Sequence, residues 1–117
     1  MQLEQLKSIV LNALEDLKGR DIRVLDVRAR ASFTDLMILV SGSSSRQVKA
    51  LADKVVEACK AAGVRPIGVE GERDAEWVLI DLGDIVVHVM QPEIREFYNL
   101  EKLWNVGTGT DSRTVTG

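Results

Sequence analysis

The hydrophobic pattern is most informative over residues 76–90, where two apolar runs flank Gly83-Asp84. Both runs are rich in β-branched and aliphatic residues, and a two-residue Gly-Asp break between such runs predicts a β-hairpin. Across a two-residue loop, directly opposed residues lie on the same face of the hairpin. We expect the wholly aliphatic face to belong to the hydrophobic core. That face consists of Val78, Ile80, Leu82, Ile85, Val87 and Val89.

The second face of the predicted hairpin mixes large apolar groups with hydrogen-bonding ones. Its opposed pairs are Trp77 with Met90, Leu79 with His88, and Asp81 with Val86. Such a mixture suits a surface that another molecule covers, so we expect this face to be open and to bind a partner. The alternative is that a short C-terminal helix folds over Trp77 and buries it. The predicted partner-binding residues are Trp77, Leu79, Asp81, His88, Met90 and Tyr98.

Apolar positions earlier in the chain predict two long helices. Over residues 2–18 they recur at steps of three and four, as in an amphipathic helix, and Gly19 is a suitable end. The second helix begins at Ser44, which has capping-box spacing to Gln47, and continues to about residue 62. Its apolar stripe includes the single cysteine, Cys59, which we interpret as a buried core residue rather than a reactive thiol.

Three further strands and a short helix complete the pattern. The strands are predicted at residues 21–27, 36–40 and 65–69, and the helix at residues 93–98 after Pro92. The second of these strands is continuously apolar, as in an interior strand, whereas the third contains proline and glycine, as in an edge strand.

The order of these elements defines the predicted architecture. It indicates a single α/β domain with a mixed five-stranded sheet and both long helices on one face. We assign residues 1–104 to this domain. Residues 105–117 are rich in glycine, threonine and serine without periodicity, and we expect a disordered tail.

Composition narrows the class of protein. The chain is 45% hydrophobic and 28% charged, as in an ordinary globular domain, and its net charge is −3. Four arginines between residues 20 and 30 are interleaved with Asp21 and Asp26, so we predict a solvated strand and little direct nucleic-acid binding. No apolar run approaches the ~20 residues needed to cross a bilayer, and the N-terminus does not resemble a signal peptide. We therefore expect a cytoplasmic protein.

Three segments together resemble the Iojap family, the bacterial ribosomal silencing factors and their organellar relatives. The first runs from Thr34-Asp35-Leu36 into Ser41-Gly42-Ser43-Ser44-Ser45-Arg46-Gln47-Val48-Lys49-Ala50. The second is the predicted hairpin from Glu76 to Val89, and the third is Arg95-Glu96-Phe97-Tyr98-Asn99-Leu100-Glu101-Lys102-Leu103-Trp104. In order and spacing they cover most of residues 1–104.

The resemblance implies a translation repressor without enzymatic activity, catalytic residues, cofactor or metal. Members of the family bind the large ribosomal subunit through its protein number fourteen, block association with the small subunit, and lower translation when nutrients are short. Their fold is similar to a nucleotidyltransferase core. An acidic chain with an aromatic-apolar face suits a basic protein partner. The sequence leaves open whether the free chain is a homodimer.

A small nucleotidyltransferase-like enzyme is the main alternative, and a generic dimerisation module is another. Gly42-Ser43 before a helix could hold a phosphate, but the next predicted strand contains no acidic residue to bind Mg²⁺. Asp35 lacks a second acid that the sequence places beside it, and His88 is the only histidine, which excludes a histidine metal cluster. We therefore interpret the glycine-serine segment as helix capping, although residual anion binding there is left open.

Overall fold

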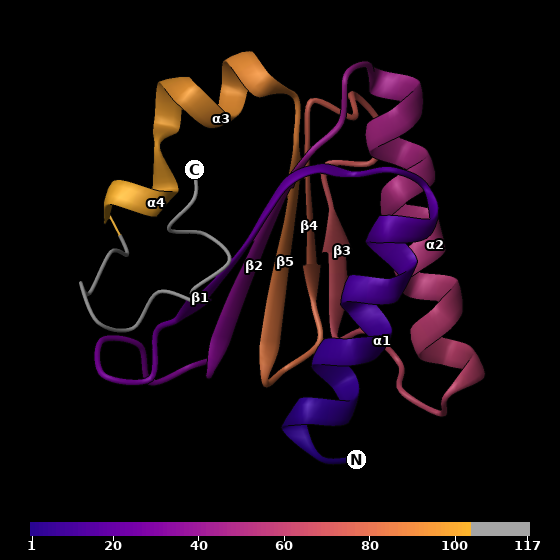
Figure 1. The fold of residues 1–117 in the computed structure, drawn as a ribbon, viewed down its shortest axis with the longest axis vertical. Helices are drawn as coiled ribbons and strands as arrows, with labels where there is room; N and C mark the ends of the chain where they lie inside the picture. The colour runs from indigo at the N-terminus through magenta and orange to yellow at the C-terminus, as the bar shows by residue number, and fades with distance from the viewer. Residues whose placement is uncertain (104–117) are drawn as a thin grey trace.

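A mixed five-stranded sheet forms the centre of the protein (Figure 1). The computed structural model describes residues 1–103. Strand order across the sheet is β1-β2-β5-β4-β3, with β2 and β5 parallel and every other neighbouring pair antiparallel. The predicted mixed five-stranded sheet is therefore confirmed. The strands are β1 (Arg20–Asp26), β2 (Leu36–Ser41), β3 (Gly68–Glu70), β4 (Trp77–Asp81) and β5 (Ile85–Met90).

Helices cover the two faces of the sheet unequally. The long helices α1 (Leu3–Asp16) and α2 (Ser45–Ala61) pack side by side on one face, as predicted (Figure 1). The short helices α3 (Pro92–Tyr98) and α4 (Leu100–Leu103) lie on the opposite side. No helix within residues 1–103 is long and apolar enough to cross a membrane. The predicted tail, residues 105–117, lies outside the described residues.

The β4–β5 hairpin has the register that its sequence predicts. Val78 opposes Val89, Ile80 opposes Val87, and the Leu82 N–H donates to the Ile85 carbonyl at 2.9 Å. Gly83 adopts a φ of +89° in the two-residue loop, a conformation that a glycine reaches without a Cβ clash. The aliphatic face packs in one buried cluster with residues of both long helices.

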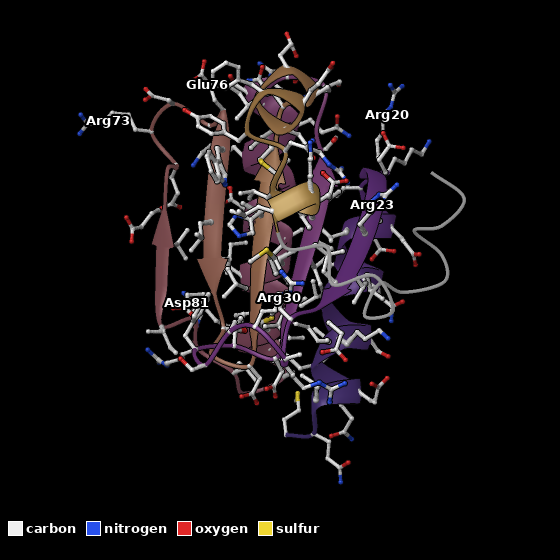
Figure 2. All side chains as sticks on the ribbon, turned by 90° about the vertical axis from the view of Figure 1, so that its left-hand side faces the viewer. Arg20, Arg23, Arg30, Arg73, Glu76 and Asp81 are labelled. Atoms are coloured by element: carbon white, nitrogen blue, oxygen red, sulfur yellow. The ribbon has the colours of Figure 1, made fainter. Side chains whose placement is uncertain are left out.

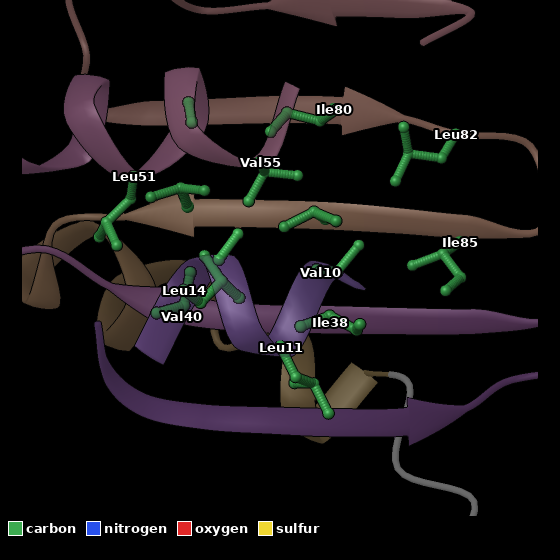
Figure 3. Packing of buried hydrophobic residues seen from close by; sticks show 14 of the residues in the cluster. Val10, Leu11, Leu14, Ile38, Val40, Leu51, Val55, Ile80, Leu82 and Ile85 are labelled. Carbon is green, nitrogen blue, oxygen red and sulfur yellow. The ribbon is translucent and has the colours of Figure 1, made fainter. Parts of the chain in front are cut away.

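Side chains from both long helices and from strands β1, β2, β4 and β5 form the main core, part of which is drawn in Figure 3. Leu14 of α1, Leu51 of α2 and Ile80 of β4 are each fully buried there. Cys59 is fully buried in the same cluster, as predicted, and burial raises the pKa of its thiol. This core fixes the sheet, and the sheet in turn positions the residues on its other face.

The residues that end α1 and cap α2 act differently from what the sequence predicted. Lys18, not Gly19, adopts the left-handed conformation after α1. Gly19 instead permits a close approach, because a Cβ there would lie 2.6 Å from Val40 Cγ2. At the start of α2, Ser44 caps the Gln47 N–H at 3.1 Å. The Gln47 side chain reaches back to the backbone N–H of Ser43 rather than of Ser44.

Candidate functional site

The sheet face opposite the long helices is only partly open. A second apolar cluster lies on it, formed by buried Leu25, Val27, Met37, Leu39 and Met90. Ile94 of α3 and Leu100 of α4 pack against this cluster. The prediction of an open face is therefore wrong for Met90, which is 0% exposed, and for His88, which is 5% exposed. The C-terminal helices cover part of the face through Ile94 and Leu100, Ala31 of the β1–β2 loop packs on the same cluster, and the Trp77 ring lies against His88.

Trp77 lies at the boundary between this buried cluster and solvent. It opposes Met90 across the hairpin, and its side chain is partly buried against the cluster. The indole Nε1–H donates to His88 Nδ1 at 2.9 Å. Because an indole nitrogen only donates, Nδ1 must be the unprotonated acceptor, so the histidine is neutral with its hydrogen on Nε2. Burial lowers the pKa of His88 to about 4, which keeps the ring neutral at physiological pH.

An exposed aromatic cluster, defined as Trp77, Phe97 and Tyr98, extends outward from this point. The Trp77 and Tyr98 rings are tilted with centroids 4.9 Å apart, and Phe97 meets Tyr98 edge-on at 5.0 Å. Tyr98 is 52% exposed and Phe97 is 80% exposed. Large aromatic side chains that stack on one another yet face solvent are typical of protein interfaces. Phe97 was not among the predicted partner-binding residues, although it directly precedes Tyr98.

The remaining predicted residues lie farther along the sheet. Leu79 opposes His88 and is partly buried. Asp81 lies at the opposite end of β4 from Glu76, as Figure 2 shows, about 13 Å from Trp77 at ~3.3 Å per residue. One carboxylate oxygen of Asp81 accepts the Gly83 N–H at 2.9 Å, which stabilises the hairpin loop. The structure therefore brings Trp77, His88, Met90 and Tyr98 together and places Asp81 apart from them.

A tightly closed loop leads into Trp77. Gly71 has a φ of +90°, and a Cβ at this position would lie only 2.0 Å from the Trp77 carbonyl oxygen. The Gly71 carbonyl accepts the N–H of Ala75, a non-glycine residue with a φ of +53°. The side-chain amide of Gln91 joins this loop to α2, because it donates to the Ala75 carbonyl at 3.4 Å and to Ser45 Oγ at 2.9 Å. The backbone before Trp77 is therefore held by contacts with two other parts of the chain.

A buried arginine attaches the C-terminal helices to the sheet. Arg95 of α3 donates through Nη1 to Ser41 Oγ at 2.9 Å, and through Nε and Nη2 to the Glu101 carboxylate at 3.1 and 2.9 Å. Arg23 of β1 also pairs with Glu101, at 3.2 Å. We name these four residues the Arg95 clasp. Sequence reasoning missed it, because the only local signal is a single arginine in the same short helix as Ile94.

We expect Glu101→Ala to lower the free energy of unfolding by about 2 kcal/mol, because the Arg95 guanidinium would remain buried without the carboxylate that pairs with it. This is below the cost of breaking a fully buried pair, since the Glu101 side chain is 22% exposed. Urea unfolding measures the loss of free energy. Amide exchange should show that the substitution accelerates the opening of α3 more than the opening of β5. Glu96→Ala, at an exposed position of α3, is the matched control. Equal stability of the two variants would contradict a stabilising clasp.

The structure supports helix capping rather than phosphate binding at Gly42-Ser43. Both the backbone N–H and the hydroxyl of Ser43 donate to Gln47 Oε1, at 2.7 and 2.8 Å. Within residues 1–103, no group of three or more His, Cys, Asp or Glu side chains is arranged to hold a metal ion.

The predicted arginine-acid interleaving also has a structural counterpart. Arg28 pairs with Asp26, and its side-chain hydrogen bond lowers the pKa of that carboxyl group. Arg23 is engaged by Glu101. Arg20 and Arg23 extend along one edge of the sheet while Arg30 lies at its lower end (Figure 2). Little direct nucleic-acid binding stays a prediction that these pairings favour.

The fold and site together define a small α/β protein with a rigidly supported aromatic surface, of the kind that acts by binding another macromolecule. The family model described as "Ribosomal silencing factor during starvation" matches residues 1–116. The chain belongs to the ribosomal silencing factor family, whose members are regulatory proteins and not enzymes. The predicted family and the predicted lack of enzymatic activity are thereby confirmed, and the nucleotidyltransferase alternative is set aside.

Individual relatives agree with the family assignment. A ribosomal silencing factor of Haemophilus influenzae is 48% identical over 99 residues, which cover 85% of this chain and 97% of that protein. A crystal structure of a Chromobacterium violaceum protein superposes with a TM-score of 0.88 at 47% identity, covering 90% of this chain and 88% of that one. A mouse protein named "Mitochondrial assembly of ribosomal large subunit protein 1" is 33% identical over 88% of this chain and 46% of its own length.

Proposed function

We propose that this protein is a cytoplasmic translation repressor that binds the large ribosomal subunit and blocks its association with the small subunit, lowering translation under nutrient limitation. Family membership supports the silencing role, and the name of the mouse relative supports the large subunit as partner. The observation that carries the proposal to this surface is the exposed aromatic cluster of Trp77, Phe97 and Tyr98.

The charges around the aromatic cluster indicate the chemistry of the partner. Glu76 precedes Trp77, and Glu93 and Glu96 lie on α3 with Phe97; all three are exposed. An aromatic surface bordered by carboxylates is complementary to a protein patch that presents apolar groups with lysine or arginine. Ribosomal protein number fourteen is the partner that we propose, in agreement with the family resemblance.

The first test is the association of purified ribosomal subunits. A several-fold excess of this protein should reduce the rate and extent of subunit joining, measured by light scattering and by sucrose-gradient sedimentation. Ile67→Ala is the control for loss of an exposed apolar side chain, because Ile67 is 73% exposed and lies outside the aromatic cluster. This variant should reduce subunit joining as strongly as the wild-type protein does. Unchanged joining at a several-fold excess would contradict the proposal.

The second test identifies the partner protein. A photoreactive benzoyl-phenylalanine at position 97 should cross-link to protein number fourteen of the large subunit, whereas the same group at position 67 should not. Mass spectrometry identifies the cross-linked peptide. A reproducible cross-link to a different protein of the large subunit would keep the large subunit as the proposed partner and reject protein fourteen. Sedimentation of the free chain separately tests the homodimer that the sequence leaves open.

A further inference from the structure

The hydrogen bond between Trp77 and His88 joins diagonal neighbours on the hairpin. Trp77 opposes Met90, and His88 opposes Leu79, so the two rings belong to adjacent pairs on the same face. Their centroids are 5.9 Å apart, and the bond from Nε1 to Nδ1 measures 2.9 Å. Diagonal positions lie within reach of aromatic side chains. The contact is therefore built into the strand register.

We infer that His88 is a positioning residue for Trp77: by accepting the indole hydrogen bond, it fixes the ring in the orientation in which the aromatic cluster meets its partner. This inference rests on the proposed function. It concerns a residue that is itself 5% exposed and therefore acts through Trp77 rather than by direct contact over a broad surface.

Two restraints act on the indole from different elements. His88 holds its nitrogen from β5, and Tyr98 packs against its ring from α3. Apolar packing has little directionality, whereas the hydrogen bond fixes where the indole nitrogen points. Together they order a large side chain before any partner arrives. Ordering a side chain in advance removes part of the entropy cost of association.

A merely space-filling role for His88 makes a different prediction. If only ring volume mattered, phenylalanine would replace histidine without loss, because it fills a similar space. Phenylalanine has no acceptor for the indole N–H, whereas asparagine can place its side-chain oxygen near the position of Nδ1. The pair His88→Phe and His88→Asn therefore separates volume from hydrogen bonding.

The test is a double-mutant cycle with Trp77→Phe, which keeps an aromatic ring but lacks the N–H. We expect His88→Phe to weaken binding to large subunits about three- to tenfold in the wild-type background. In the Trp77→Phe background the same change should cost less than about twofold, because no indole N–H remains to be held. His88→Asn should bind within about twofold of wild type.

A spectroscopic readout follows the same bond without the ribosome. The indole ¹H–¹⁵N resonance of Trp77 is identified by its loss in Trp77→Phe. In His88→Phe this resonance should move and its proton should exchange faster with water, while His88→Asn should preserve the protection. Melting temperatures of all variants confirm that each is folded.

The outcomes distinguish failure of the positioning role from failure of the proposed function. An equal loss from His88→Phe in both Trp77 backgrounds, or no loss in either, would overturn the positioning role while large-subunit binding stands. An unchanged indole resonance in His88→Phe would also overturn it. A wild-type chain that does not bind large subunits would overturn the proposed function and the positioning role together.

Discussion

Trp77→Ala is expected to weaken binding to the large subunit about thirtyfold, the equivalent of ~2 kcal/mol for a central aromatic residue at an interface. Most of the folding free energy should remain, because Trp77 is partly exposed at the edge of the smaller apolar cluster. Binding isotherms with isolated large subunits measure the first effect, and thermal unfolding measures the second.

Ile80→Ala supplies the opposite result on the same strand. Ile80 is fully buried in the main core, and its truncation should lower the free energy of unfolding by about 2–5 kcal/mol. The folded fraction of this variant should bind the large subunit with unchanged affinity. If Trp77→Ala unfolds the domain as readily as Ile80→Ala, the aromatic cluster is part of the core and the partner surface lies elsewhere.

Acid is expected to destabilise the protein through His88, by roughly 3 kcal/mol between pH 6.5 and pH 4. The pKa of the folded histidine is lowered by burial to about 4, from an ordinary value of 6.5. Within that window the unfolded chain binds a proton at this position and the folded chain does not, so stability falls as the pH falls. Well above pH 6.5 neither state binds this proton, so the loss of stability is absent. The free energy of unfolding, measured by urea unfolding at half-unit pH steps, tests this expectation.

A matched variant isolates this contribution from the carboxyl groups that titrate over the same range. His88→Asn lacks the titrating ring, so its unfolding free energy should decrease less steeply than that of wild type between pH 6.5 and 4. The difference between the two curves is attributed to His88. Parallel curves would show that the folded protein admits a proton at His88 as readily as the unfolded chain does.

The hairpin and its two faces were predictable because strand periodicity and a two-residue loop determine the register by themselves. The predicted pairs Ile80 with Val87 and Leu79 with His88 both occur. The buried strand at residues 36–40 was equally accessible, since an uninterrupted apolar run requires cover on both sides, and every residue of β2 is buried.

The burial of Met90 could not be decided from the sequence, which allowed both an open face and cover by a C-terminal helix, because the outcome depends on where a short helix docks. The contact that places α3 joins Arg95 to Ser41, which are 54 positions apart in the sequence. No local periodicity records such a pair. The same limit applies to the Trp77–His88 hydrogen bond: the register placed the two residues on one face, but their side-chain orientations required the surrounding packing.

The division of the aromatic cluster between β4 and α3 makes the binding surface separable from the main core. Trp77 belongs to a strand that the long helices support, whereas Tyr98 belongs to a helix that the Arg95 clasp attaches to the sheet. Opening of the clasp would move Tyr98 away from Trp77 and leave the main core folded. The free energy that keeps the binding surface assembled is therefore a local one, smaller than the free energy of unfolding of the whole domain.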